Sequence, residues 1–259
     1  MSVQKSWSEL QTMARACRIV VETLDLLEAA AQPGVTTKEL DRVAREAIER
    51  AGARPAFLGY RDYPATLCIS VNEEIVHGIP GPKKLREGDI VGLDLGCIVD
   101  GFYGDAARTV AVGRASAEAE RLMQVTREAL FAGIEMCRPG KRVGDIGHAV
   151  QTHAESFGYS VVKDFVGHGI GTSLHEEPQV PNYGPPGRRE RLVPGMCLAI
   201  EPMVNVGGPE VEVLSDGWTA VTRDGSLSAH FELSIAVTEF GPWILSEAYP
   251  YAGEEAANA

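Results

Sequence analysis

Two segments of the sequence each carry one acidic residue at the end of an apolar strand. Residues 85–94 read LREGDIVGLD and residues 192–201 read LVPGMCLAIE, so in both a leucine precedes a glycine by three positions and an acid follows it by six. Burying a carboxylate in an apolar strand is costly unless a positive charge meets it. Asp94 and Glu201 are therefore expected to share a cation-binding site between two halves of the chain.

The residues after Asp94 predict where a second carboxylate lies. Asp100 and Gly101 stand between two β-rich runs, which indicates a two-residue hairpin turn. In that register Gly96 lies opposite Asp105, and Asp94 is on the same face of the hairpin as Asp105. The two carboxylates then become diagonal neighbours, roughly 7–8 Å apart at the backbone.

Strand alternation adds a fourth acid. In residues 230–237 (HFELSIAV) Glu232 falls on the polar side of the strand, as Glu201 does in its own strand. Four neighbouring carboxylates would repel one another, whereas two divalent ions cancel their charge. Any one of these acids alone is more often a solvated residue or part of a surface ion pair. The set of four, Asp94, Asp105, Glu201 and Glu232, favours a metal site.

Three of the six histidines stand in glycine-rich segments. His77 and His168 each begin a His-Gly-Ile run, and His175 closes the second of these segments. A single histidine of this kind is more often structural, but three beside an acidic cluster favour a site. Carboxylates with one or two imidazoles suit manganese, iron(II) or cobalt at least as well as zinc. His148 and His153, five apart on a predicted helix, are expected to be structural or exposed.

Two helix pairs are expected to position these residues. A capping-box pattern at Ser6 begins a helix that Pro33 stops, and a second one at Thr36 begins a helix that ends at Gly52. The plan recurs as a helix over residues 117–137 and a shorter helix ending near Gly158. The landmarks keep a nearly constant offset: 106 residues from Pro33-Gly34 to Pro139-Gly140, 106 from Gly52 to Gly158, and 107 from Asp94 to Glu201.

The repeated plan indicates an internal duplication within one α+β domain. We predict a single domain over residues 1–259, with halves at roughly 5–112 and 115–240 that are related by a pseudo-twofold axis and share one sheet. Two independent domains joined near residue 115 are the alternative, but no linker rich in proline, glycine, serine or charge separates the halves. Residues 247–259 are predicted to form a flexible tail.

The composition limits the class of protein, its direct partners and its location in the cell. With 44% hydrophobic and 23% charged residues the 259-residue chain is expected to be globular, and its net charge of −12 argues against nucleic acid as a direct partner. No apolar run approaches membrane-spanning length, and the N-terminus has no apolar signal core, so a cytoplasmic location is expected. The five cysteines are odd in number and scattered, which predicts reduced thiols: Cys17, Cys68, Cys97, Cys137 and Cys197.

At these residues the chain resembles the methionine aminopeptidases, over nearly its whole length. The matching motifs are VNEEIVHGIP (residues 71–80), Asp94 with Asp105, GHGIG (167–171), HEEPQVP (175–181), AIEP (199–202) and Glu232. The resemblance implies the pita-bread fold, in which two helix-helix-strand halves share a curved antiparallel sheet with a dinuclear metal site in its cleft. The metal ligands it implies are Asp94, Asp105, His168, Glu201 and Glu232.

The resemblance also implies an activity and its catalytic residues. The family removes the N-terminal initiator methionine from nascent proteins when the second residue is small, and two divalent ions, Fe(II), Mn(II), Co(II) or Zn(II), activate a bridging water that attacks the scissile carbonyl. Glu201 is implied as the proton shuttle. His175 is implied to contact the scissile carbonyl or its oxyanion, and His77 the peptide nitrogen.

Further residues are implied to bind the methionine side chain and a structural ion. Two positions depart from the family, since many relatives carry phenylalanine at Leu174 and cysteine at Phe57, which affects the shape of the methionine pocket. Asn72 and Ser228 match positions that bind a structural monovalent cation in relatives. The implied pocket residues are Tyr60, Tyr63, Cys68, Leu174 and Trp218.

The resemblance also implies a subtype of the family, defined by its extensions and insertions, and the partners of the protein. The core starts near the N-terminus without the zinc-finger extension of the cytosolic eukaryotic type I enzymes, and residues 175–201 are too short for the helical insertion of type II. The chain is therefore similar to the short bacterial type I form. Nascent polypeptide N-termini are the implied partner, contact with the ribosome exit site is an additional expectation, and a monomer is expected.

Two other functions stay open at this point. A proline-specific aminopeptidase or dipeptidase shares the fold, but such enzymes usually carry a substantial extra N-terminal domain for which this chain has no room. A non-catalytic pita-bread protein that binds peptides or the ribosome is the alternative from another class. Such proteins typically lose metal ligands, and all five are present here.

Overall fold

The computed structural model describes residues 4–250, which form four α-helices among short and long strands. The first half contains α1 (Trp7–Ala30), α2 (Thr37–Arg50), β1 (Arg54–Pro55), the 3-10 turn η1 (Tyr60–Asp62), β2 (Leu67–Val71), β3 (Glu74–Val76), β4 (Ile90–Val99) and β5 (Phe102–Ala111). The second half begins with α3 (Ala117–Ile134), α4 (Val143–Ser156), β6 (Ser160–Val161), β7 (Gly167–Gly169), β8 (Glu176–Val180) and β9 (Cys197–Ile200). It ends with β10 (Met203–Asn205), β11 (Val211–Val213), β12 (Ala220–Thr222), β13 (Ser228–His230), β14 (Glu232–Val237) and β15 (Pro242–Ile244).

A nine-stranded antiparallel sheet joins the two halves. Its main path runs β1-β4-β5-β14-β9-β7-β8, while β2 pairs with β4 and β15 pairs with β14. The halves meet where β5 pairs with β14. Two three-stranded sheets, β13-β10-β6 and β11-β12-β3, flank the main sheet. The order helix, helix, strands thus occurs twice along the chain, although a duplication as its origin stays a prediction.

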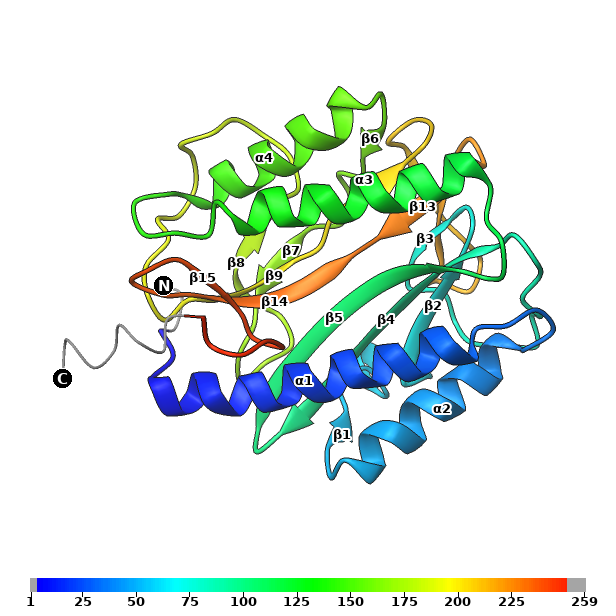
Figure 1. Cartoon of the computed structure of the whole chain (residues 1–259), viewed down its shortest axis with the longest axis horizontal. Helices are drawn as coiled ribbons and strands as arrows, with labels where there is room; N and C mark the ends of the chain where they lie inside the picture. Colours follow the sequence, from blue (N-terminus) through cyan, green and yellow to red (C-terminus); the bar gives the residue numbers. More distant parts are fainter. Residues whose placement is uncertain (1–3, 251–259) are drawn as a thin grey trace.

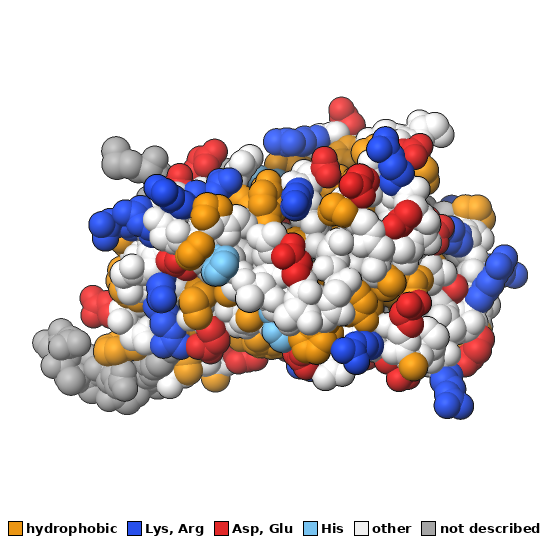
Figure 2. Space-filling model, turned by 90° about the horizontal axis from the view of Figure 1, so that it is seen from above, with side chains coloured by type: hydrophobic (Ala, Val, Ile, Leu, Met, Phe, Trp, Pro, Cys, Tyr) orange, Lys and Arg blue, Asp and Glu red, His pale blue; other side chains and the backbone are white. Residues whose placement is uncertain are grey.

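Two helix pairs cover the sheet (Figure 1). α1 packs across β4 and β5 and against α2, whereas α3 packs on α4 and reaches the strands of the second half. Viewed onto α3 and α4, cationic and anionic side chains are interspersed over the surface, as is typical of the solvent-facing side of amphipathic helices (Figure 2). The apolar sides of α1 and α2 face inward, where Leu24 and Leu40 are buried together with Leu93 of β4 in one hydrophobic cluster.

The predicted helix boundaries are confirmed at three of the four helices. The amide of Ser6 donates to Glu9 at 2.7 Å and that of Thr36 donates to Glu39 at 2.7 Å, so both predicted capping boxes form. The third helix ends at Ile134, three residues before the predicted end at 137. The amide of Cys137 bonds instead to the Ile134 carbonyl at 2.8 Å, which tightens the chain into a turn before Pro139.

The predicted hairpin register is confirmed. β4 and β5 pair so that Val99 faces Phe102 and Gly96 faces Asp105. Asp94 faces Ala107, two positions beyond Asp105 on the same side of the hairpin. Since side chains alternate between the faces of a strand, the opposite side of β4 carries the core residues, and Leu93 is fully buried there.

The described part of the C-terminal segment contacts the start of α1. Tyr249 packs its ring 4.8 Å from the ring of Trp7 and 5.1 Å from that of Trp243, centroid to centroid. These aromatic contacts place residue 249 beside α1, while a flexible tail over residues 247–259 stays a prediction. Residues 251–259 of that predicted tail lie outside the described residues. Within residues 4–250 no helix is long and apolar enough to cross a membrane.

Candidate active site

One cavity of about 160 Å³ gathers the residues that the sequence singled out. It contains every predicted ligand, catalytic histidine and methionine-pocket residue, whereas Asn72 and Ser228 lie outside it. Phe57 and Arg61 complete its walls. The predicted residues around the cavity are Tyr60, Tyr63, Cys68, His77, Asp94, Asp105, His168, Leu174, His175, Glu201, Trp218 and Glu232.

Sheet order explains how the five predicted ligands converge. Asp94 lies on β4, Asp105 on β5, Glu232 at the start of β14, Glu201 directly after β9 and His168 on β7, and these are five successive strands of the main sheet. Register aligns them as well, because Ala107 of β5 faces Asp94 on one side and Glu232 on the other. Adjacent strands are separated by about 4.8 Å, so side chains at aligned positions on neighbouring strands lie close together.

The donor atoms lie close together. One donor atom each from Asp105, His168 and Glu232 falls within 4.8 Å of the others. His168 Nε2 is 3.5 Å from Glu201 Oε1 and 3.9 Å from Asp105 Oδ2. Among the described residues, Asp94 Oδ1, Asp105 Oδ1 and Glu232 Oε1 are buried without any hydrogen-bond partner. Buried oxygens in this state are costly unless a cation meets them, so the donor set fits divalent metal ions.

The electrostatics of the cluster support the same conclusion. Burial raises the pKa of Asp94 to about 7, and burial together with the neighbouring carboxylates raises the pKa of Asp105 and Glu232 well above the usual range. Burial and then Asp94 raise the pKa of Glu201 in the same direction. Burial lowers the pKa of His168 to about 3, so its ring is neutral and keeps a free lone pair. Protons or metal ions must balance this charge, and near neutral pH divalent ions do so more completely.

His175 is held by a tyrosine. Its Nδ1 lies 2.7 Å from Tyr60 Oη, and its ring centroid is 4.2 Å from that of His168. Burial, and to a lesser degree Arg61, lowers the pKa of His175, so the ring is neutral at pH 7. If the tyrosine hydroxyl donates to Nδ1, the proton of the imidazole resides on Nε2, which then serves as a hydrogen-bond donor.

His77 approaches the centre from the first half of the chain. Its backbone has φ 62°, and its ring stands edge-on to Phe165 and Trp218 at 5.2 and 6.1 Å. Burial and then His175 lower the pKa of His77 to about 4, so it is neutral. The following Gly78 is required, because a Cβ there would lie 2.1 Å from the carbonyl oxygen of Ile69.

An apolar chamber adjoins the carboxylates. Phe57, Cys68 and Leu174 are buried against one another, and Tyr63 meets the ring of Trp218 edge-on at 5.0 Å. The Tyr63 hydroxyl donates to backbone carbonyl oxygens, 3.1 Å to Leu67 and 2.9 Å to Gly78, and presents no unpaired polar group. Aromatic faces and a soft sulfur suit a flexible thioether side chain.

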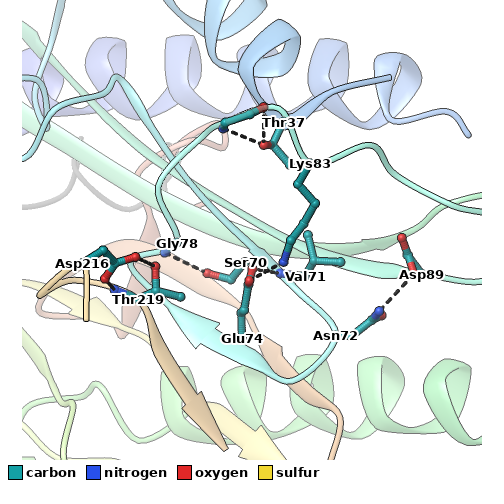
Figure 3. A network of polar contacts seen from close by, with 11 residues as sticks. Thr37, Ser70, Val71, Asn72, Glu74, Gly78, Lys83, Asp89, Asp216 and Thr219 are labelled. Atoms are coloured by element: carbon teal, nitrogen blue, oxygen red, sulfur yellow. Dashed lines mark hydrogen bonds and ion pairs between the residues drawn. The ribbon is translucent and has the colours of Figure 1, made fainter. Parts of the chain in front are cut away.

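A polar network supports the segment that carries His77 (Figure 3). Ser70 Oγ accepts from the amide of Gly78 at 3.3 Å. The side chain of Asn72 donates to Asp89 Oδ1 at 2.9 Å (Figure 3). The backbone carbonyl of Asn72 accepts from the amide of Ser228 at 2.9 Å. Asn72 and Ser228 are therefore neighbours, while a monovalent cation beside them stays a prediction.

His230 also lies near the centre, although it was not among the predicted site residues. Its Nε2 is 3.9 Å from Glu232 Oε2, and donor atoms of Glu201, His230 and Glu232 lie within 4.8 Å of one another. The alternation of residues 230–237 had placed it on the same side as Glu232, which was the available signal. Arg61, which also lines the cavity, was not predicted either. Its backbone has φ 47°, a left-handed conformation that no local sequence pattern predicts.

Replacing Tyr60 by phenylalanine is the first test of this geometry. Tyr60→Phe removes the hydroxyl that fixes the imidazole orientation of His175, so we expect kcat to fall about tenfold with little change in bound metal. Steady-state kinetics and elemental analysis of the same preparation measure both quantities. Tyr159→Phe, a half-buried tyrosine outside the cavity, is the matched control. An unchanged kcat in Tyr60→Phe would show that this hydrogen bond has no catalytic role.

Fold and site together define a metallopeptidase. The profile of metallopeptidase family M24 matches residues 11–239, and the chain belongs to this family. Its fold is the pita-bread fold, shared with the crystal structure of a methionine aminopeptidase from Thermotoga maritima at a TM-score of 0.94 and 46% identity, over 96% of this chain and all of that one.

Sequence similarity within the family points to one branch. The chain is 52% identical to the methionine aminopeptidase of Clostridium acetobutylicum over 247 residues, covering 95% of this chain and 99% of the relative. A prolidase from Pyrococcus furiosus shares the fold alone, with a TM-score of 0.76 and 22% identity, and the match covers 96% of this chain but 66% of the prolidase.

Proposed function

We propose that the chain is a methionine aminopeptidase that removes the initiator methionine from nascent proteins when the second residue is small. The observation that carries this proposal is one cavity in which the five predicted metal donors from successive strands adjoin an apolar chamber. A free N-terminal residue with an apolar side chain would fill the chamber while its peptide bond lies at the donors. Near full-length similarity to methionine aminopeptidases supports the same substrate.

The predicted ligands would hold two divalent ions in this arrangement. Asp94, Asp105, His168, Glu201 and Glu232 supply up to eight carboxylate oxygens and one imidazole nitrogen, a set that accepts Fe(II), Mn(II), Co(II) or Zn(II). When bound, such ions polarise the scissile carbonyl and lower the pKa of water into the neutral range.

The protein's own groups would perform the proton transfers and orientation. Glu201 would accept the proton from the attacking water and return it to the leaving amine, because its carboxylate lies among the predicted donors, with Oε1 3.5 Å from His168 Nε2. His175 would donate through Nε2 to the carbonyl oxygen as negative charge develops there. His77, neutral at pH 7, would contact the nitrogen of the scissile peptide.

The chamber would select the methionine side chain. Its walls are the rings of Phe57, Tyr63 and Trp218 with the side chains of Cys68 and Leu174. A charged side chain would lose its hydration there without finding a partner. Many relatives have phenylalanine at position 174 and cysteine at position 57, whereas this chain has leucine and phenylalanine there. The aromatic ring thus stands at position 57 instead of 174, which alters the shape of the chamber while keeping it apolar.

We also propose a setting for the reaction. All five cysteines are buried and unpaired, which supports a reducing compartment such as the cytoplasm. The enzyme would act as a monomer on N-termini that emerge from the ribosome, and contact with the exit site is part of this proposal.

Peptide turnover distinguishes this function from its rivals. Purified protein is titrated with Mn(II), Co(II), Fe(II) and Zn(II) in the presence of Met-Ala-Ser, Met-Leu-Ser, acetyl-Met-Ala-Ser and Ala-Pro peptides. We expect metal-dependent release of free methionine from Met-Ala-Ser and little from the other three. Cleavage of Ala-Pro instead would indicate a proline-specific enzyme, and no turnover with any ion would indicate a peptide-binding protein.

A further inference from the structure

A lysine near the N-terminus is buried at the back of the catalytic loop. The Lys5 ammonium lies 2.5 Å from Glu176 Oε2, with the two side chains only 4% and 15% exposed. In every other ion pair of a lysine or arginine within residues 4–250, the cation is at least 24% exposed. Lysine is almost never fully buried unless it is paired, so the contact with Glu176 compensates for the burial of the Lys5 ammonium.

Glu176 closes the loop that presents His175. It follows His175 directly, and its second oxygen, Oε1, accepts from the amides of Thr172 at 2.8 Å and Ser173 at 3.2 Å. One carboxylate therefore binds the beginning of the loop to its end. Leu174 of the apolar chamber lies within the same closed loop.

The stem of Lys5 packs on the backbone of this loop. A Cβ at Gly171 would lie 2.4 Å from Lys5 Cε and 2.6 Å from Glu176 Oε1, so the three groups meet without space for another atom. The backbone amide of Lys5 donates to the carbonyl oxygen of Gly195 at 2.8 Å, just before β9 and Glu201. Lys5 thus binds both the loop of His175 and the segment that leads to Glu201.

We infer that Lys5 is a positioning residue, which holds the loop 171–176 through Glu176 and so fixes the place of His175 and Leu174 in the site. This inference rests on the proposed function, in which His175 donates to the scissile carbonyl. Tyr60 orients the imidazole ring from one side, and the Lys5–Glu176 pair holds its backbone from the other. Without the ammonium, Glu176 retains a buried charge that must find water or a proton, and either change loosens the loop.

Methionine at position 5 provides the main test, because it keeps the apolar stem and removes the charge. We expect Lys5→Met to lower kcat for Met-Ala-Ser by about tenfold to a hundredfold, since a misplacement near 1 Å suffices for this, and to change KM much less. Lys5→Arg, which restores the cation, should recover most of kcat. Glu176→Gln should behave like Lys5→Met, because its amide keeps an acceptor for the two loop amides but loses the ion pair.

Arg15→Met is the matched control. It also removes an N-terminal cation with a distant partner, Asp100 at 2.6 Å, but that pair is more than half exposed and outside the cavity. We expect its kcat to equal that of the unaltered protein. Should Lys5→Met not fold, the comparison of Glu176→Gln with Arg15→Met decides the same question.

Hydrogen exchange supplies a readout that does not depend on turnover. The amides of Thr172 and Ser173 are expected to exchange faster in Lys5→Met than in Arg15→Met when both are measured well below their Tm. An unchanged kcat or unchanged exchange in Lys5→Met would overturn the inference. If the unaltered protein releases no methionine at all, the proposed function fails, while exchange still tests whether Lys5 holds the loop.

Discussion

His175→Ala is expected to lower kcat by about 10²–10³-fold while leaving the bound metal unchanged, since removal of one donor to a developing oxyanion has effects of this size. The imidazole lies beside the carboxylate cluster, 4.2 Å from the ring of His168, yet its Nδ1 is taken by Tyr60. Only Nε2 is left to face a substrate. The ring should therefore stabilise charge on the scissile carbonyl and should not be needed to hold the ions.

The measurement pairs single-turnover kinetics on Met-Ala-Ser with metal analysis of the same sample. His148→Ala is the matched control, because His148 is exposed on α4 and lies outside the cavity. A parallel loss of metal and kcat in His175→Ala would make His175 a ligand or a structural residue, contrary to the role proposed here. Retention of full kcat would remove it from the mechanism altogether.

Local sequence rules predicted the strand register that brings Asp94 and Asp105 to one face of the hairpin, for a physical reason. A two-residue turn at Asp100-Gly101 fixes strand register, and the alternation of side chains then fixes which residues share a face. The pairing of Gly96 with Asp105 follows from these two rules alone and is found in the structure. Helix boundaries were predictable on the same basis, because caps are made by residues within three positions of one another.

Long-range strand pairing could not be predicted in this way. The residues near Glu232 do not predict that β14 lies between β5 and β9. That strand order results from long-range pairing between the two halves of the chain. The walls of the apolar chamber come from residues 57–68, 174 and 218, and only resemblance to a family brought these together before the structure did. His230 shares a strand face with Glu232, but its distance to Glu201 depends on the same pairing.

The buried Lys5–Glu176 ion pair shows most clearly which contacts could not be predicted from the sequence. Lys5 and Glu176 are separated by 171 positions, and each alone has the pattern of an exposed surface residue. Their burial follows from the antiparallel neighbours β7 and β8, whose loop folds back toward the N-terminal segment. Sequence patterns report the environment of a residue well only where that environment is supplied by nearby residues.

The metal-free protein is expected to become less stable as the pH rises from 6.5 to 8.5. Asp105, Glu201 and Glu232 have pKa values raised well above the usual range in the folded state, mainly by burial. The folded state then binds more protons than the unfolded state, whose carboxyl groups are ionised above about pH 4. The stability that these carboxyl groups contribute is therefore fully present below that pH and is lost as the pH rises through the folded pKa values.

Above pH 6.5 these carboxyl groups are the main source of the pH dependence, and near pH 8.5 the five buried cysteines, whose pKa values burial raises, add a smaller loss of stability in the same direction. The buried His77 and His168 have folded pKa values lowered to about 4 and about 3, so they oppose folding only below the ordinary histidine pKa near 6.5. Asp94, with a pKa of about 7, completes most of its ionisation early in the window. Each proton retained across two pH units corresponds to about 3 kcal/mol, or a fall in Tm of roughly 6–12 °C.

Thermal melts in the presence of a chelator, and again with saturating Mn(II), test this expectation. Metal ions replace the retained protons, so the difference in Tm between loaded and metal-free protein should widen with pH, and binding should release protons. Asp105→Asn keeps the shape of the side chain but cannot ionise, and its metal-free melts should depend less on pH. Asp100→Asn, at the exposed hairpin turn, should behave like the unaltered protein. A metal-free Tm that stays constant or rises over this window would mean that the four carboxyl groups do not form a shared, buried charge cluster, and the case for two divalent ions would lose its electrostatic basis.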